Sequence, residues 1–100
     1  MYGLIGKFIA HEGKREDLIA VLLTASAELP GCLSYIVARD PGDASTLWVT
    51  EVWESEQSHV ASLKLPAVQV AIAEARPWIV GIERVATTEP MGGHGLVAGV

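Results

Sequence analysis

In the middle of the chain, two apolar segments (residues 32–39 and 46–53) are separated only by a short polar stretch. That stretch contains Pro41 and Gly42 between two aspartates, a composition typical of a tight turn. So short a connection joins antiparallel neighbours, because parallel strands need a crossover of a dozen or more residues. We therefore predict a β-hairpin at the centre of the chain.

A helical pattern precedes this hairpin. Residues 14–28 place apolar side chains near helical spacing, with Ile19 and Leu23 widening the stripe. We expect Pro30 and Gly31 to end the helix, because proline cannot continue a helix and glycine favours its C-terminus. The leucines that define the stripe are Leu18, Leu22 and Leu29.

A second helical pattern follows the hairpin. Ser55 is a candidate N-cap for a helix over residues 56–65. Pro66 can occupy the first turn of a further segment that runs to residue 76 and stops at Pro77. That segment carries apolar side chains at i, i+4 and i+7, namely Val68, Ile72 and Ala75.

The two ends of the chain read as strands. Residues 2–11 and 78–86 are rich in β-forming residues, which gives the order β-α-β-β-α-β. This is the split βαβ arrangement of the ferredoxin-like α+β fold, with an antiparallel sheet. We expect one domain over residues 1–87, followed by a glycine-rich tail over residues 88–100. In one hypothesis the tail crosses to a partner chain through Leu96 and Val97.

In such a fold both helices cover one face of the sheet and leave the other bare. The third strand has apolar residues on both faces, because Leu47 and Val49 alternate with Trp48 and Val52. The bare face therefore needs an apolar cover. A second copy of the chain is the simplest one, and we predict a homodimer.

Composition excludes several functions. Hydrophobic residues make up 50% of the chain, the net charge is −5, and no basic cluster occurs. Nucleic acids and anionic membrane surfaces both attract basic patches, so neither is an expected partner. No apolar run approaches the roughly 20 residues of a membrane helix. The N-terminus lacks the basic and apolar regions of a signal peptide.

Cysteine and histidine usage bears on the cellular compartment and on metal binding. Cys32 is the only cysteine, which suits a reducing cytoplasm. The three histidines, at positions 11, 59 and 94, show no metal-ligand spacing, so no metal site is expected.

Three segments carry a resemblance to a known family. They are Pro30-Gly31-Cys32-Leu33-Ser34-Tyr35, Glu51-Val52-Trp53-Glu54-Ser55 and Leu63-Lys64-Leu65-Pro66. Through these segments the chain resembles the antibiotic biosynthesis monooxygenase (ABM) family, which includes quinol monooxygenase-like members, over about residues 2–86.

This resemblance implies a homodimer with sheets packed back to back, a dimeric α/β barrel. It also implies a pocket between the sheet and the helices of each protomer. Some such proteins oxygenate quinol- or anthrone-like aromatics with molecular oxygen and need no flavin, haem or metal. Others are non-oxygenase enzymes. A non-oxygenase enzyme or small-molecule binding protein on the same scaffold is therefore the alternative function.

The chain departs from the family pattern at several positions. Relatives commonly carry histidines where this chain has Ser62 and Ala67. Haem-degrading relatives carry an asparagine, a tryptophan and a histidine at the positions of Gly6, Ser62 and Ile72, so haem breakdown is not expected.

Three residues are candidates for catalysis. His59 is the only histidine in the second helical region, and its ordinary pKa of about 6.5 suits a general base. Glu51 lies mid-strand between apolar neighbours, as a pocket group or as an ion-pair partner at the dimer interface. Tyr35 can donate a hydrogen bond to a substrate oxygen. The structural alternatives are a helix histidine bonded to a neighbour and a core tyrosine.

Four further residues are candidates for substrate binding. Trp53 shares a strand face with Glu51 and can form an aromatic wall, or it packs in the core. Arg84 on the last strand can pair with Glu51 or hold an oxyanion. Ser62 and Ile72 occupy the family's site positions on the second helical region.

Overall fold

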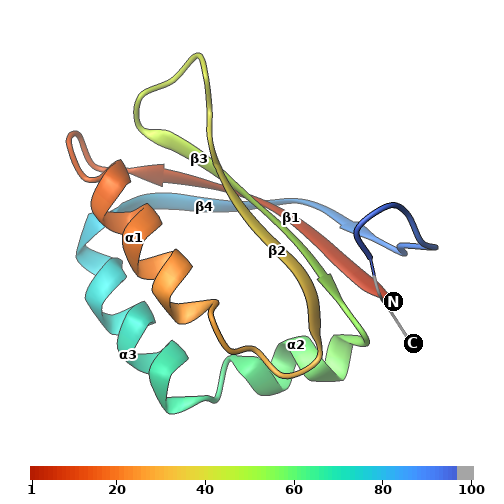
Figure 1. Cartoon of the computed structure of the whole chain (residues 1–100). Coiled ribbons are helices and arrows are strands. Elements are labelled where there is room, and N and C mark those ends of the chain that lie inside the picture. Colours follow the sequence, from red (N-terminus) through yellow and green to blue (C-terminus); the bar gives the residue numbers. More distant parts are fainter. Residues whose placement is uncertain (97–100) are drawn as a thin grey trace.

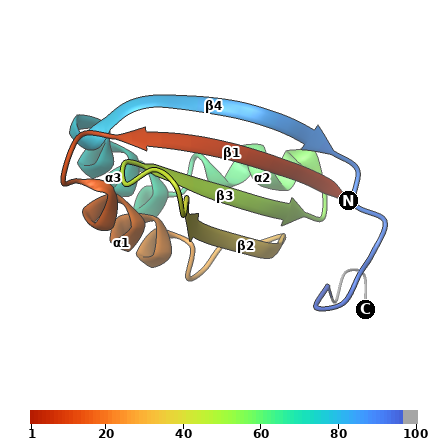
Figure 2. The same ribbon diagram turned by 90° about the horizontal axis from the view of Figure 1, so that it is seen from above.

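The computed structural model describes residues 1–96 as one antiparallel sheet with helices on one face (Figures 1 and 2). The strand order is β2-β3-β1-β4, which confirms the ferredoxin-like prediction and places the first strand inside the sheet. The elements are β1 (Tyr2–Ala10), α1 (Arg15–Ala25), β2 (Cys32–Arg39), β3 (Thr46–Trp53), α2 (Glu56–Ser62), α3 (Pro66–Ala75), the 3-10 helix η1 (Arg76–Trp78) and β4 (Ile79–Thr88).

Helix α1 is shorter than the predicted span of residues 14–28, since it ends at Ala25. Two hydroxyl groups bond to the backbone near this end: Thr24 donates to the carbonyl of Ala20 at 3.0 Å, and Ser26 to that of Leu23 at 3.1 Å. Such local bonds compete with helical ones. Leu23 is 53% exposed, so its predicted place in the core-facing stripe was wrong.

The other boundaries differ from prediction by a few residues. Helix α2 stops at Ser62, and its N-cap is confirmed because the Ser55 hydroxyl accepts from the Ser58 amide at 3.2 Å. Pro77 lies inside η1, so β4 begins one residue late and continues to Thr88. None of the helices in residues 1–96 is both long and apolar enough to cross a membrane.

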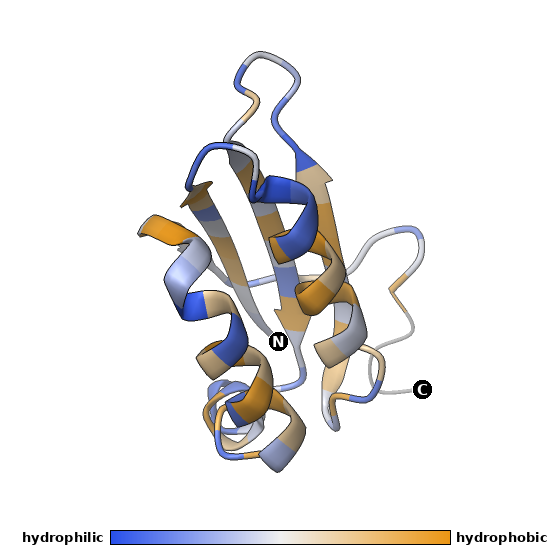
Figure 3. Cartoon of the chain, turned by 90° about the vertical axis from the view of Figure 1, so that its left-hand side faces the viewer, coloured by the Kyte–Doolittle hydropathy of each residue, from blue (hydrophilic) through white to orange (hydrophobic). Residues whose placement is uncertain are grey.

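The core lies between the sheet and the pair formed by α1 and α3. Leu18 of α1 and Leu47 of β3 are fully buried, and Val49 and Ala75 join them. Figure 3 looks onto the helix layer, with hydrophobic parts of the strands behind α1 and α3. Burial of these side chains supplies the main force that holds the helices to the sheet.

The opposite face of the sheet is not covered by any element of residues 1–96. Ile36 of β2 is 57% exposed there, and Ile9 of β1 is 38% exposed. The Lys7 ammonium lies 5.7 Å from the centre of the Trp48 ring, within cation–π range. The Trp48 indole donates to a carboxylate oxygen of Asp40 at 2.9 Å, and this hydrogen bond lowers the pKa of Asp40.

The tail has only local structure in the described residues. After β4 the chain turns back near the N-terminal end of β1 (Figure 1), where a Cβ at Gly3 would lie 3.0 Å from Pro90. The Leu96 amide donates to the carbonyl of Gly93 in a turn. Val97, the other residue of the tail hypothesis, lies outside the described residues, so crossing to a partner stays a prediction.

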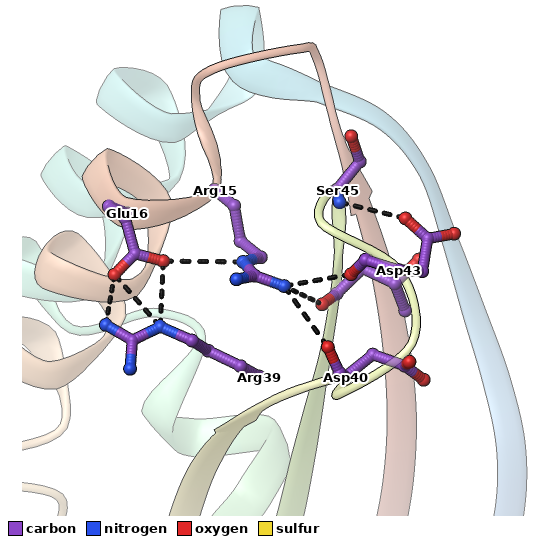
Figure 4. Close-up of polar contacts among 7 residues, drawn as sticks. Arg15, Glu16, Arg39, Asp40, Asp43 and Ser45 are labelled. Carbon is purple, nitrogen blue, oxygen red and sulfur yellow. Dashed lines mark hydrogen bonds and ion pairs between the residues drawn. The ribbon is translucent and has the colours of Figure 1, made fainter.

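One arginine ties the start of α1 to the β2–β3 hairpin (Figure 4). The Arg15 guanidinium donates to the carbonyl oxygens of Asp43 at 2.8 Å, and of Asp40 and Thr46 at 3.3 Å each. Its side chain is only 17% exposed. By contrast, Arg39 pairs with Glu16 on the open surface. Arg15 therefore fixes the turn to the helix layer.

Replacing Arg15 with alanine should lower the free energy of unfolding by about 1–3 kcal/mol, because a mostly buried charged donor to three carbonyls of the hairpin turn is lost. Arg39→Ala is the matched control and should have little effect, since exposed ion pairs add little stability. Urea denaturation of both variants measures the difference. Equal stabilities would show that Arg15 does not anchor the hairpin.

Candidate active site

A cavity of about 340 Å³ lies between the sheet and the three helices. Most of its lining is apolar, from β1, β4 and the facing sides of α1 and α3. Besides the indole of Trp53, five lining residues carry polar side-chain groups, namely Ser26, Tyr35, Glu51, His59 and Ser62. An apolar slot with a few convergent polar groups is the usual form of a small-molecule site.

A larger surface groove of about 640 Å³ runs between α1 and α3 but offers little chemistry. Alanine, valine and proline dominate its lining, with Thr24 and Glu74 as the polar members. No histidine, cysteine or aromatic ring lines it. We therefore assign the candidate site to the smaller cavity.

Glu51 is held in place by the neighbouring tryptophan. The Trp53 indole N–H donates to Oε1 of Glu51 at 2.9 Å, since both residues lie on the helix face of β3. Trp53 itself is 1% exposed and cannot shift without disturbing the core. The carboxylate is therefore oriented, and within residues 1–96 its second oxygen accepts no hydrogen bond.

His59 lies beside this carboxylate. Its Nε2 is 4.0 Å from Oε1 of Glu51, and the two side chains are only 12% and 16% exposed. The imidazole packs edge-on against Trp53, with ring centres 5.4 Å apart, and against Tyr2 at 5.8 Å. The imidazole therefore has an acidic neighbour and two aromatic neighbours, and its position in the cavity is suitable for a general base.

Helix α2 positions this histidine. The N-cap at Ser55 fixes the first turn of the helix, so His59 projects from its fourth residue toward the sheet. The buried Ser62 hydroxyl donates to the backbone carbonyl of His59 at 2.6 Å. Ser62 therefore supports the turn that carries the imidazole.

Tyr35 lies opposite Glu51 in the pairing of β2 with β3. Burial raises the pKa of its phenol, and the negative charge of Glu51 raises it further. The phenol therefore stays protonated across the physiological range. It lines the cavity as a hydrogen-bond donor rather than as a base.

The structure brings together six of the seven predicted site residues. These six line the cavity: Tyr35, Glu51, Trp53, His59, Ser62 and Ile72. Arg84 is the exception, because it is exposed on the edge strand β4 and makes no ion pair with Glu51. Arg84 lies opposite Gly6 of β1, and Glu51 lies opposite Leu4, so the first alternative for Arg84, a pair with Glu51, does not form. Its other alternative, a contact with an oxyanion, stays a prediction.

Sequence reasoning missed two aromatic residues of β1. Phe8 lines the cavity, and the ring of Tyr2 packs against His59. Both lie on the helix face of the strand, at alternate positions from Leu4. The strand has apolar residues on both faces, so its sequence pattern does not show which of the two sets of alternate residues faces the helices.

The structure shows neither a reactive thiol nor a metal cluster among the described residues. The Cys32 thiol donates to the carbonyls of Ser34 and Val52, and burial raises its pKa. No group of three or more acidic, histidine or cysteine side chains in residues 1–96 is arranged to hold a metal ion.

Comparisons with known proteins were made on the sequence and on the fold. The profile of the family "Antibiotic biosynthesis monooxygenase" matches residues 1–74. A candidate antibiotic biosynthesis monooxygenase from Chloroflexus aurantiacus is 54% identical, with 95% of this chain and 97% of that one covered and a TM-score of 0.91. None of the functionally curated proteins matches the sequence significantly.

More distant structures share the fold. SnoaB, a cofactor-independent oxygenase from Streptomyces nogalater, is 15% identical with a TM-score of 0.75, covering 93% of this chain and 95% of that one. A candidate antibiotic biosynthesis monooxygenase from Deinococcus radiodurans is 23% identical with a TM-score of 0.77, covering 93% and 95%. At these identities the likeness shows a common architecture.

The raised pKa of Tyr35 has a consequence for stability at high pH. The protonated Tyr35 phenol makes its full contribution to the free energy of unfolding below pH about 10, the pKa of an unfolded tyrosine. This contribution is lost as the pH rises from there toward the higher pKa of Tyr35 in the folded protein. Wild-type stability should therefore fall above pH about 10, relative to Tyr35→Phe, by at most about 1.4 kcal/mol per pH unit. Denaturant titrations of both proteins at several pH values measure this, and parallel curves would contradict it.

Proposed function

This chain belongs to the antibiotic biosynthesis monooxygenase family, and on that premise we propose that it is a cofactor-independent monooxygenase. Its substrate in this proposal is a quinol- or anthrone-like aromatic, oxidised with molecular oxygen. Family membership supports a monooxygenase-like function. The single observation that carries the proposal is His59 beside the oriented carboxylate of Glu51, inside a cavity that is otherwise almost wholly apolar.

The arrangement fits the first chemical step. A quinol or anthrone reacts with oxygen once it has lost a proton, because the anion is electron-rich. Nε2 of His59 accepts that proton, and Glu51 at 4.0 Å stabilises the resulting imidazolium. The Tyr35 phenol donates a hydrogen bond to the substrate oxygen that becomes negative.

The net reaction needs no further reductant. One atom of O2 enters the substrate and the other leaves as water, and the substrate supplies all four electrons. The apolar lining limits the access of bulk water to the anion. Trp53 and Ile72 form opposite parts of the wall against which a flat ring can lie, and Ser62 supports the base.

The second candidate is a non-oxygenase enzyme or a small-molecule binding protein with the same cavity. Ser62 and Ala67 favour it, because they stand where relatives commonly carry histidine. The Ser62 hydroxyl is bonded to the His59 carbonyl and does not replace an imidazole. Oxygen uptake separates the two candidates.

The proposal includes a homodimer formed through the bare face of the sheet. Exposed Ile36 and Ile9, together with the half-buried Trp48, give that face an apolar surface. A second copy buries the same residues by symmetry.

A reducing cytoplasm suits Cys32 as the only cysteine. In this arrangement residues 1–87 form the domain and residues 88–100 an appended tail.

His59→Ala should reduce oxygen consumption with a quinol or anthrone by about 10²- to 10⁴-fold, the usual contribution of a general base. An oxygen electrode measures the rate for a panel of such compounds. His11→Ala is the matched control, because this exposed histidine lies outside the cavity. Wild-type protein that consumes no oxygen with any compound would favour the second candidate.

Ile36→Asp should convert the dimer to monomers, because it places a charge on the apolar surface that the second copy covers in this proposal. Val70→Asp is the control, since Val70 is 67% exposed on the helix side. Analytical ultracentrifugation gives the mass of each variant. A monomeric wild type, or an Ile36→Asp variant that stays dimeric, would rule out this interface.

A further inference from the structure

We propose that the cavity selects uncharged aromatic ligands over those that bear a carboxylate, and that Glu51 is the residue responsible. This rests on the proposed function, because it treats the cavity as the aromatic site. It goes further by dividing the substrates of that class according to charge.

The lining of the cavity contains one acidic side chain, Glu51. In the proposed reaction His59 enters as the neutral base, so it offers no positive charge to an incoming ligand. No lysine or arginine lines the cavity. Lys7 lies over Trp48 on the other face of the sheet, and Arg84 is exposed on the edge strand. An anionic ligand would therefore meet a carboxylate and no compensating cation.

Glu51 cannot turn away to relieve this repulsion. Its Oε1 is fixed by the Trp53 indole at 2.9 Å, and Trp53 is buried in the core. The carboxylate side chain is 16% exposed, so water and salt screen its field weakly. The same field reaches two groups on β2, since the charge of Glu51 contributes to the raised pKa values of Tyr35 and Cys32.

This field does not oppose the proposed reaction. Transfer of the substrate proton to His59 creates one negative and one positive charge inside the cavity, so its total charge is unchanged. The imidazolium forms 4.0 Å from Glu51, where the carboxylate favours it. A carboxylate on the incoming ligand is different, because it adds a second negative charge and must also lose its hydration.

Three ligands isolate the effect of charge from that of size: a naphthohydroquinone, its ring-carboxylated acid, and the methyl ester of that acid. Isothermal titration calorimetry without oxygen measures their dissociation constants at neutral pH. For charges roughly 8 Å apart at an effective dielectric constant of about 20, wild-type protein should bind the ester about thirtyfold more tightly than the acid.

Glu51→Gln should reduce this ester-to-acid ratio by about thirtyfold, because the amide keeps an oxygen for the Trp53 indole but removes the charge from which the ratio arises. Glu54→Gln is the matched control, since Glu54 is exposed and lies outside the cavity lining, and the ratio should stay unchanged. Circular dichroism and thermal unfolding check that both variants are folded.

Equal binding of ester and acid by wild-type protein, or an unchanged ratio in Glu51→Gln, would overturn the charge selection and leave the oxygenase proposal standing. Failure of all three ligands to bind would overturn both, because the cavity would then not be an aromatic site. Oxygen uptake is absent from this experiment, so an inactive protein that binds the ester selectively still supports the inference.

Discussion

The pairing of β1 with β3 in the middle of the sheet determines where everything else lies. It sets Leu47, Val49, Glu51 and Trp53 in one row on the helix face of β3. The first two join the core, and the last two form the wall of the cavity. A slip of one residue would move the whole row to the other face, because side chains alternate along a strand.

Burial of a carboxylate beside this core is costly, and the structure offsets the cost with a specific partner. The Trp53 indole donates to Glu51, and His59 lies at 4.0 Å. A buried polar group is stable only where such contacts replace the water that it loses. The three side chains therefore depend on one another: Trp53 orients Glu51, and both lie beside His59.

Local patterns predicted most of the fold. The turn at Pro41 and Gly42 lies where the hairpin closes, and the spans of β2 and β3 agree with prediction. The end of α1 was missed because Thr24 and Ser26 bond to nearby carbonyls. The suggested pair of Arg84 with Glu51 does not form, because Arg84 lies opposite Gly6 of β1 and Glu51 lies opposite Leu4, a cross-strand register that composition does not encode.

By itself, the sequence determined that Glu51 and Trp53 share a face of β3 and that Trp48 lies on the other, because alternation is a property of any strand. Only the tertiary structure decided which of these two apolar faces the helices cover. That choice depends on how α1 and α3 pack over the completed sheet, which brings Phe8 of β1 and Ile72 of α3 to one cavity. The same packing places His59 on α2 beside Glu51, so an alternating strand and a capped helix become one candidate site.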